Sequence, residues 1–268
     1  MTARDDTGAC LAAFMDLIET ARELVSELRE LRFAPPVAYV YNPLEYAWDN
    51  HKTYLERFGA RPREAVLIGM NPGPWGMMQT GVPFGDAGMV RDWMGIDGKV
   101  GQPRAQHPIR PVLGCECPRG EISGQRLWGW ARQRYGTAGA FFARYFVLNY
   151  CPLGFLEASG RNRTPDRLPR AEKTALFEVC DRALVRAIAW LAPRYVIGIG
   201  RFAAERARRA VADVEIGVIP HPSPASPAAN RGWALKAEQA LMSIGVEPRV
   251  PDTKACGSVA AASADESP

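Results

Sequence analysis

Four short apolar runs, separated by segments with helical periodicity, restrict the fold of this chain more than any other feature of its sequence. The runs span residues 65–70, 145–149, 195–200 and 215–219, and Gly, Pro or Asn stands at or beside the end of each. Runs of this length, rich in Val, Ile and Leu, predict strands buried on both faces. Strands that alternate with helices predict a parallel sheet covered on both sides. We therefore expect an α/β fold, a three-layer α/β/α sandwich with a short, mainly parallel central sheet.

The segments around these runs carry helical periodicity. In the first of them, apolar residues recur at intervals of three and four and charged residues fill the other face, as expected of a helix packed on a core. The predicted helices span residues 8–32, 171–191, 201–212 and 228–245. A chain of 268 residues is long enough for one sizeable core, so we predict a single domain over residues 1–250. The Ala, Ser and Asp content of residues 251–268 predicts a disordered tail.

Charge and hydropathy narrow the classes of protein to which the chain can belong. Its formal net charge of +4 permits contact with a polyanion such as DNA without establishing it. No apolar stretch reaches the roughly 18 residues of a membrane-spanning helix, and residues 1–6 lack a secretory pattern. We expect no membrane partner and a location in the cytoplasm of a bacterium or the nucleus of a eukaryote. Nothing in the sequence suggests an assembly larger than a monomer.

Cysteine and histidine spacing gives little reason to expect a metal site. The six cysteines form no Cys-x-x-Cys pair, and the chain has three histidines, whereas zinc and iron–sulfur sites usually need tighter ligand groups. The pair Cys115-x-Cys117 is the one feature that keeps a metal open. We expect no cofactor and no disulfide framework.

Four arginines lie on the predicted helix over residues 201–212, at positions 201, 206, 208 and 209. The start of a helix can bind phosphate, but an arginine face in contact with solvent fits the same pattern. The Gly-Ile-Gly at 198–200 is too short a signal to indicate a dinucleotide site. Both interpretations of the arginines stay open.

Three loops that follow predicted strands carry unusual sequences, at residues 69–85, 149–153 and 221–224. In parallel sheets, ligands bind at the loops after the carboxyl ends of the strands. Prolines fix φ and glycines allow a close backbone approach, so these loops are expected to be rigid and to face a ligand. A single Pro/Gly loop is usually only a turn, whereas three at one edge of a sheet indicate a binding site.

The motifs of these loops belong to a wider pattern. They are Gly-Met-Asn-Pro-Gly-Pro at 69–74, Gln-Thr-Gly-Val-Pro-Phe-Gly at 79–85, Met-Val-Arg-Asp-Trp at 89–93, Arg-Pro-Val-Leu-Gly at 110–114, Ser-Gly-Arg-Asn at 159–162 and His-Pro-Ser-Pro at 221–224. With these motifs, from about residue 38 to 245, the chain resembles the single-strand-selective monofunctional uracil-DNA glycosylases of the uracil-DNA glycosylase superfamily. The resemblance implies one glycosylase domain and a hydrolase without cofactor or lyase activity. Such an enzyme removes uracil from single- and double-stranded DNA and leaves an abasic site for base excision repair.

The resemblance implies two catalytic residues, Asn71 and His221. Asn71 matches the residue that positions the attacking water; an amide is a poor base, so orientation matters more than basicity. His221 matches the residue that donates a hydrogen bond to uracil O2 as negative charge develops there, which is worth about 3–4 kcal/mol in a dry pocket.

Four further residues are implied to bind the flipped base. Asn149 matches the residue whose amide reads uracil N3–H and O4, and we expect a neighbouring contact to hold that amide one way round. Phe84 matches the aromatic that stacks on the base, and backbone groups around Met70 complete the pocket. Gly73 stands where stricter relatives place a bulky ring against C5, so 5-substituted uracils such as 5-hydroxymethyluracil are expected to fit.

Ser223, Pro224 and Ala225 are implied to contact DNA. Relatives often carry a large side chain at the last of these positions, which wedges into the gap left by the flipped base. The methyl group of Ala225 fills little of that gap. We therefore predict a stronger bias towards single strands than in relatives with a wedge.

Two other functions remain alternatives. Space beside Gly73 would allow a glycosylase directed at deaminated purines, xanthine or hypoxanthine. A catalytically inactive module that only binds damaged DNA is a second possibility, but such a module would have lost Asn71 or His221, and both are present. The matched loops contain no lysine, so no Schiff-base lyase step is expected.

Overall fold

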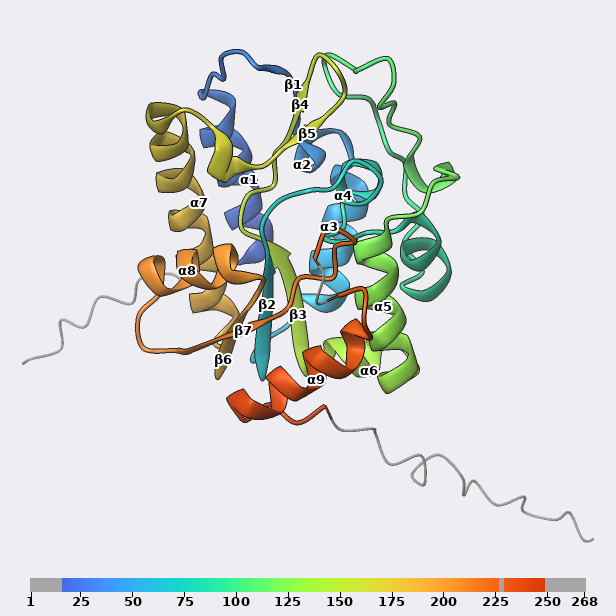
Figure 1. Cartoon of the computed structure of the whole chain (residues 1–268), viewed down its shortest axis with the longest axis vertical. Coiled ribbons are helices and arrows are strands. Elements are labelled where there is room, and N and C mark those ends of the chain that lie inside the picture. Colours follow the sequence, from blue (N-terminus) through green and yellow to red (C-terminus); the bar gives the residue numbers. More distant parts are fainter. Residues whose placement is uncertain (1–15, 227–228, 249–268) are drawn as a thin grey trace, which may run out of the picture.

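A computed structural model describes residues 16–226 and 229–248 of the chain and places four parallel strands at its centre (Figure 1). They are β2 (Ala65–Gly69), β3 (Tyr145–Asn149), β6 (Tyr195–Ile199) and β7 (Glu215–Ile219), in the order β3-β2-β6-β7. Each lies within one residue of its predicted bounds. The prediction of a mainly parallel central sheet in an α/β fold is confirmed.

Helices cover both faces of this sheet. The register pairs Gly198 of β6 with Val218 of β7, and Ile197 with Gly217, and successive residues of a strand point to opposite faces. A Cβ on Gly198 would collide with the backbone of Ala204, whereas a Cβ on Gly217 would collide with Ile244. The two helices that bear these residues therefore lie on opposite faces, which makes the sandwich three-layered.

The helices of the two layers follow the strands of the sheet in the chain. On one side α7 (Arg170–Leu191) packs on α8 (Arg201–Ala210), and on the other α5 (Ile122–Tyr135) packs on α9 (Trp233–Ile244) (Figure 1). The remaining helices and helical turns are α1 (Leu17–Arg29), α2 (Pro43–Tyr46), α3 (Trp48–Phe58), α4 (Met77–Thr80), α6 (Ala138–Phe142) and turns at Met89–Trp93, Gly114–Glu116 and Pro165–Arg167.

The first predicted helix, over residues 8–32, begins at Leu17. Asp16 accepts the Glu19 N–H at 2.7 Å and the Glu19 carboxylate accepts the Asp16 N–H at 3.2 Å. This reciprocal cap satisfies two helix N–H groups that would otherwise lack a partner. Residues 1–15, like the predicted tail at 251–268, lie outside the described residues.

The prediction that all four strands are buried on both faces was wrong for β7. Every residue of β2 and β6 is buried, but in β7 Glu215 is exposed and Val218 is 37% exposed. β7 is an edge strand of the sheet, with β6 as its one neighbour. Edge strands have less helix and strand cover than central ones, so their side chains meet solvent.

A second, antiparallel sheet was not predicted. It consists of β1 (Val37–Tyr41), β4 (Gly154–Glu157) and β5 (Asn162–Arg163), in the order β1-β4-β5. Strands of two to five residues, one with an irregular register at Val37 and Tyr39, carry too little periodicity to be recognised. The hairpin of β4 and β5 follows the loop after β3 and so belongs to the loop end of the central sheet.

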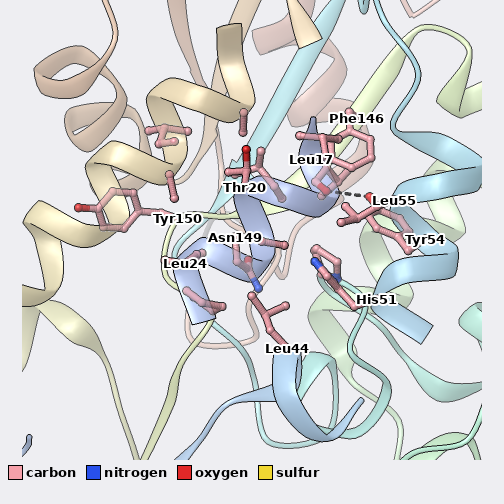
Figure 2. Close-up of a pocket in the computed structure, with 18 of the residues that line it drawn as sticks. Leu17, Thr20, Leu24, Leu44, His51, Tyr54, Leu55, Phe146, Asn149 and Tyr150 are labelled. Carbon is pink, nitrogen blue, oxygen red and sulfur yellow. Dashed lines mark hydrogen bonds between the residues drawn. The ribbon is translucent and has the colours of Figure 1, made fainter. Parts of the chain in front are cut away.

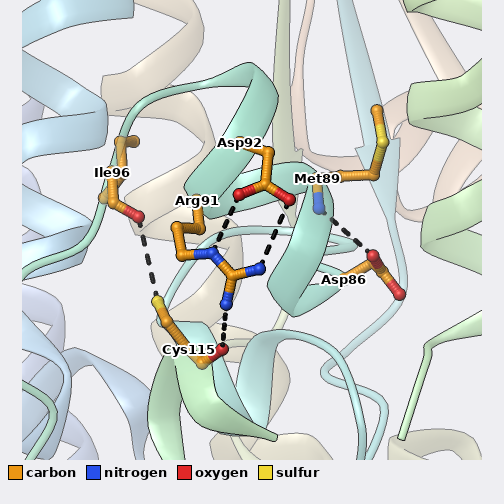
Figure 3. Close-up of polar contacts among 6 residues, drawn as sticks. All are labelled: Asp86, Met89, Arg91, Asp92, Ile96 and Cys115. Atoms are coloured by element: carbon orange, nitrogen blue, oxygen red, sulfur yellow. Dashed lines mark hydrogen bonds and ion pairs between the residues drawn. The ribbon is translucent and has the colours of Figure 1, made fainter. Parts of the chain in front are cut away.

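Polar contacts hold the long irregular segment between α4 and α5 (Figure 3). Asp86 is buried and accepts the Met89 N–H at 3.2 Å. The Arg91 guanidinium pairs with Asp92 at 2.8 Å and donates to the Cys115 carbonyl at 3.2 Å. These contacts fasten the chain just beyond Phe84, one of the predicted site residues.

Candidate active site

The loops that follow β2, β3 and β7 line one cavity of about 390 Å³. They meet because the parallel strands end in register, with Gly69 opposite Asn149 and Ile199 opposite Ile219. Seven of the nine residues predicted for the site line this cavity: Met70, Asn71, Gly73, Phe84, Asn149, His221 and Ser223.

The other two predicted residues, Pro224 and Ala225, lie outside the cavity on the exposed turn that follows Ser223. The Ala225 N–H donates to the Ser223 hydroxyl at 3.2 Å, and the Asn230 amide donates to the Pro224 carbonyl at 2.9 Å. The turn therefore has a defined shape at the side of the cavity. Contact of these residues with DNA stays a prediction.

Asn71 is oriented by its amide nitrogen. Nδ2 donates to the Leu153 carbonyl at 3.3 Å and weakly to the Pro72 carbonyl at 3.4 Å. An amide group has a donor end and an acceptor end, so fixing the nitrogen leaves Oδ1 as the end available to a water in the cavity. The geometry suits a side chain that orients water.

His221 is held as a neutral ring. Its Nδ1 accepts the Ser223 N–H at 3.0 Å, so Nδ1 is unprotonated and the single proton of the neutral ring lies on Nε2. Burial lowers the pKa of His221 to about 4. At neutral pH the residue therefore offers one N–H donor and no positive charge.

The loop that carries His221 is fastened to two helices. Arg126 of α5 donates to the Pro222 carbonyl at 2.8 Å and to Asn230 Oδ1 at 3.0 Å. Trp233 of α9 donates its indole N–H to the Pro220 carbonyl at 2.7 Å. The residues on either side of His221 are thus both fixed.

Phe84 takes a backbone conformation that few side chains adopt. Its φ is 53°, in the left-handed region that is a genuine outlier for a bulky residue and often marks a functional site. The indole N–H of Trp128 donates to its carbonyl at 3.0 Å. A Cβ on Gly124 would collide with that carbonyl, and a Cβ on Gly69 would lie 2.6 Å from the Phe84 ring. Two glycines therefore allow this ring position.

Asn149 faces the cavity from the end of β3. Its Oδ1 lies beside Gly69, whose Cβ, were there one, would collide with it. Its Nδ2 donates to the Met77 sulfur at 3.2 Å. A thioether accepts hydrogen bonds and never donates them, so it favours the nitrogen on that side. Met77 makes the contact that was expected to hold the amide one way round.

Glu121, which the sequence did not suggest, also lines the cavity. A Cβ on Gly73 would lie 2.5 Å from Glu121 Oε2, and one on Gly76 would lie 2.9 Å from Glu121 Cγ. Burial raises the pKa of this carboxyl group. The space beside Gly73 is therefore bounded by a carboxyl group rather than open, because the start of α5 packs against the loop. Nothing in the sequence indicates that Glu121 lies close to the motif that contains Gly73.

Seven more residues of the cavity were not predicted as site residues. Four of them lie in the loop over residues 69–85, and the other three are Ser123, Asn162 and Thr164. Asn162 ends the Ser-Gly-Arg-Asn motif at 159–162, so the motif was the available signal. Its position in β5 brings it to the cavity because the β4–β5 hairpin folds back over the loop end of the central sheet.

Comparisons with known proteins show the family to which the chain belongs. The model of the uracil DNA glycosylase superfamily matches residues 57–241. A rat protein named single-strand selective monofunctional uracil-DNA glycosylase is 48% identical over 239 residues, which cover 88% of this chain and 86% of the rat protein. A cattle protein of the same name is 49% identical over 229 residues, 84% of each chain. This chain belongs to the single-strand-selective monofunctional uracil-DNA glycosylase family.

The fold of this family member also resembles a solved structure. The crystal structure of SMUG2 from Pedobacter heparinus matches it with a TM-score of 0.60 over 84% of this chain and 97% of that one. The two sequences are 17% identical, so the likeness concerns the fold alone. It agrees with the prediction of a uracil-DNA glycosylase-like sandwich.

Behind Asn149 the glycosylase has a second, smaller pocket of about 80 Å³ (Figure 2). Residues of α1, α3, β3 and α7 line it, nearly all of them apolar. Its histidine, His51, donates from Nδ1 to the Gly81 carbonyl at 2.8 Å, and burial lowers its pKa to about 4. His51 is a structural residue, and the pocket backs Asn149 with an apolar wall in which hydrogen bonds are stronger than in water.

Of the four arginines on α8, Arg206 has an internal role in the glycosylase fold. It donates to the Tyr150 hydroxyl at 3.0 Å and pairs with Asp181, and Tyr150 itself donates to Asp181 at 2.7 Å. Because Tyr150 follows Asn149 directly, this network anchors the loop after β3. Arg206 therefore belongs neither to a phosphate site nor to a solvent-facing surface.

The described residues contain no group of three or more His, Cys, Asp or Glu side chains that could hold a metal ion. Burial raises the pKa of Cys115 to about 11 and also raises that of Cys117, so both are protonated thiols at neutral pH. In the same part of the glycosylase chain, no helix is both long and apolar enough to cross a bilayer.

Proposed function

We propose that this chain is a monofunctional DNA glycosylase that hydrolyses the N-glycosidic bond of uracil and leaves an abasic site. The observation that carries the proposal is the convergence of Asn71, Asn149, His221 and Phe84 on one cavity, which is large enough to admit a base. A base can enter such a cavity only after it leaves the stack, at a cost of about a few kcal/mol. The product, an intact strand lacking one base, is the starting point of base excision repair.

His221 stabilises the leaving group. As the bond between sugar C1′ and base N1 breaks, negative charge develops on uracil and positive charge on the sugar. The Nε2–H of a neutral ring donates to uracil O2 as that charge grows. A donor of this kind, fixed before the reaction by Ser223 and Arg126, is worth about 10²–10³ in rate.

Asn71 orients the attacking water. With Nδ2 bound to the Leu153 carbonyl, Oδ1 accepts a hydrogen bond from a water and directs its oxygen to C1′. When the glycosidic bond is mostly broken before water attacks, orientation suffices and a strong base is unnecessary. The proton of that water ends in solvent.

Asn149 distinguishes uracil from cytosine. Its Oδ1 accepts uracil N3–H and its Nδ2 donates to O4, while the second Nδ2 hydrogen points to the Met77 sulfur. Cytosine presents the reversed pattern and would leave two buried polar groups facing like partners, which a site of this type rejects strongly. The Phe84 ring stacks on either base and adds about 1–3 kcal/mol of binding.

Glu121 defines which 5-substituted uracils fit. Its carboxyl group lies beside Gly73, on the side where we expect C5 of the base. A carboxylate accepts a hydrogen bond from the hydroxyl of 5-hydroxymethyluracil, so we extend the proposed substrates to this base. The same side chain narrows the space that xanthine or hypoxanthine would need and does not favour that alternative.

We further propose that single strands are preferred over duplexes. A single strand requires no unpairing of the target base. The exposed Ala225 beside the cavity has only a methyl group to fill the gap that a flipped base leaves in a duplex. Duplex uracil should be excised, but more slowly.

The test uses an end-labelled oligonucleotide with one uracil, single-stranded or in a duplex, followed by alkali. Strand cleavage that requires alkali demonstrates base excision without lyase activity. Asn71→Ala and His221→Ala should each slow single-turnover excision by at least about 10²-fold while thermal unfolding stays close to wild type. Absence of excision by the wild type would refute the function. Wild-type rates in both variants would refute the roles of the two residues.

A further inference from the structure

Two arginines meet on one tryptophan ring beside the cavity. The guanidinium carbon of Arg119 lies 4.6 Å from the centre of the Trp75 ring, and that of Arg110 lies 5.2 Å from it. Trp75 stands between Pro74 and Gly76, both of which line the cavity. We call these three residues the Arg110–Trp75–Arg119 cluster.

Two of the segments that form the cluster are joined by a buried side chain, Gln79. Its Nε2 donates to the Pro74 carbonyl and to the Pro111 carbonyl, both at 2.9 Å, and its Oε1 accepts the Leu113 N–H at 2.7 Å. The loop that carries Trp75 and the segment that carries Arg110 are thus fixed to each other. Two of the three residues of the cluster are therefore placed before any ligand binds, and Arg119 contacts them through the Trp75 ring.

The charges of the cluster are not neutralised within the described residues. Arg110 donates to the Gly160 carbonyl at 2.9 Å and the Ile109 carbonyl at 3.3 Å, and neither Arg110 nor Arg119 forms an ion pair with a described carboxylate. Other arginines of the chain do form such pairs, as Arg206 does with Asp181. Two cations on one ring repel each other, and an anion bound between them would remove that repulsion.

We propose that the Arg110–Trp75–Arg119 cluster binds a phosphate of the DNA strand next to the extruded nucleotide. The inference rests on the proposed function, because a base in the cavity brings its own backbone to the cavity's edge. Guanidinium groups bind phosphate through paired N–H donors. Since these groups lie over the Trp75 ring, the ring positions the two cations. Phosphate contacts of this kind fix the register of the strand without reading its sequence.

The experiment measures binding rather than excision. Fluorescence anisotropy of a labelled, uracil-free single strand gives Kd over a range of salt concentrations for the wild type, Arg119→Gln and Trp75→Ala. The matched control is Arg209→Gln, an equal loss of charge on an exposed arginine in the last turn of α8. That turn lies at the opposite end of the sheet from the cavity, because α8 starts at the carboxyl end of β6.

We expect Arg119→Gln to weaken binding by about 5- to 10-fold at low salt and to reduce the slope of log Kd against log salt by about 0.7, the value for one phosphate of a single strand. Trp75→Ala should weaken binding at least as much, because it removes the ring over which both arginines lie. Arg209→Gln should bind as the wild type does. The Arg119 side chain is exposed and makes no hydrogen bond with the described residues, so its loss should leave thermal unfolding unchanged.

Wild-type affinity and salt slope in Arg119→Gln would overturn the inference, whether or not Trp75→Ala folds. So would an equal loss in Arg209→Gln, because the effect would then be one of net charge alone. A failure of the proposed function is separate from both outcomes. It would show as a wild type that excises no uracil while Arg119→Gln still weakens binding to the uracil-free strand.

Discussion

At the scale of single residues, Gly69 is the position on which both base-binding side chains depend. A Cβ there would collide with Asn149 Oδ1 and lie 2.6 Å from the Phe84 ring. Both groups are ends of side chains, so Gly69→Ala should displace them at little cost in stability. Because displacements of about 1 Å can cost about 10²-fold in rate, we expect single-turnover excision of uracil to fall by at least about that factor.

The matched control for Gly69→Ala is Gly129→Ala in α5, where an added Cβ meets nothing within 4 Å. Alanine in a helix is favoured over glycine by about 1 kcal/mol, so this variant should keep its excision rate and unfold at a slightly higher temperature. An active Gly69→Ala enzyme would mean that Asn149 and Phe84 do not hold the base.

Met77 is a positioning residue for the Asn149 side chain. Met77→Leu keeps the volume of the side chain and removes the acceptor for Nδ2, whereas Met77→Gln restores an acceptor. Without the sulfur contact, the amide can turn over and present the pattern that suits cytosine. Loss of one hydrogen bond of about 1 kcal/mol should reduce the preference for uracil over cytosine by about 5-fold.

The measurement for Met77 compares excision of uracil and cytosine in otherwise identical single strands. We expect the uracil preference to drop in Met77→Leu and to recover, at least in part, in Met77→Gln. A packing role alone would slow both bases equally, so an unchanged ratio in Met77→Leu would contradict a role in orientation.

At the scale of elements, α5 organises the site from one side. Its first turns bring Glu121 and Ser123 to the cavity, and one turn later Arg126 fastens the His221 loop through the Pro222 carbonyl. Arg126→Ala should let this loop move and weaken the hydrogen bond to uracil O2. We expect kcat to fall by about 10-fold or more with a smaller change in KM, because the bond strengthens mainly in the transition state.

Steady-state kinetics on a single-stranded substrate checks the Arg126 prediction, with Arg132→Ala as the control. Arg132 is exposed in the last turn of the same helix, away from the cavity. A drop confined to KM in Arg126→Ala would indicate that the residue binds DNA instead of positioning His221.

The elements also explain how far sequence alone could predict this molecule. The four strands of the central sheet were predictable because each is one apolar run, such as Ala65–Gly69, with a turn residue at or beside its end. The antiparallel sheet was not predictable, because the two residues of β5 form a strand only by pairing with β4. Likewise Asn71 and His221 follow strands and carry motifs, whereas Glu121 reaches the cavity through the packing of α5, which leaves no local signal.

At the scale of the whole molecule, the site depends on the sandwich as a unit. The loops after β2, β3 and β7 supply Asn71, Asn149 and His221, and these strands belong to one sheet in which β6 lies between β2 and β7. A shift of β7 along β6 would move His221 relative to the other two side chains. Excision at this cavity therefore depends on the stability of the whole fold. Acid that lowers this stability should also lower the excision rate.

The two histidines with pKa values of about 4, His51 and His221, predict how acid acts on stability. In the unfolded chain a histidine has a pKa of about 6.5, so between pH 6.5 and 4 the unfolded state binds protons that the folded state does not. The free energy of unfolding should therefore fall as the pH drops through this window and stay level above it. The fully buried His51 alone accounts for up to about 3 kcal/mol. The raised pKa of Glu121 acts in the opposite direction, so the total change is smaller than the sum over both rings.

Urea unfolding at pH 7.5, 6.0 and 5.0 measures this change in the free energy of unfolding. The variant His51→Gln, which can still donate to the Gly81 carbonyl, isolates the share of one ring. The stability of this variant should depend less on pH than that of the wild type. Identical pH dependence in the two proteins would show that His51 is not held neutral by burial.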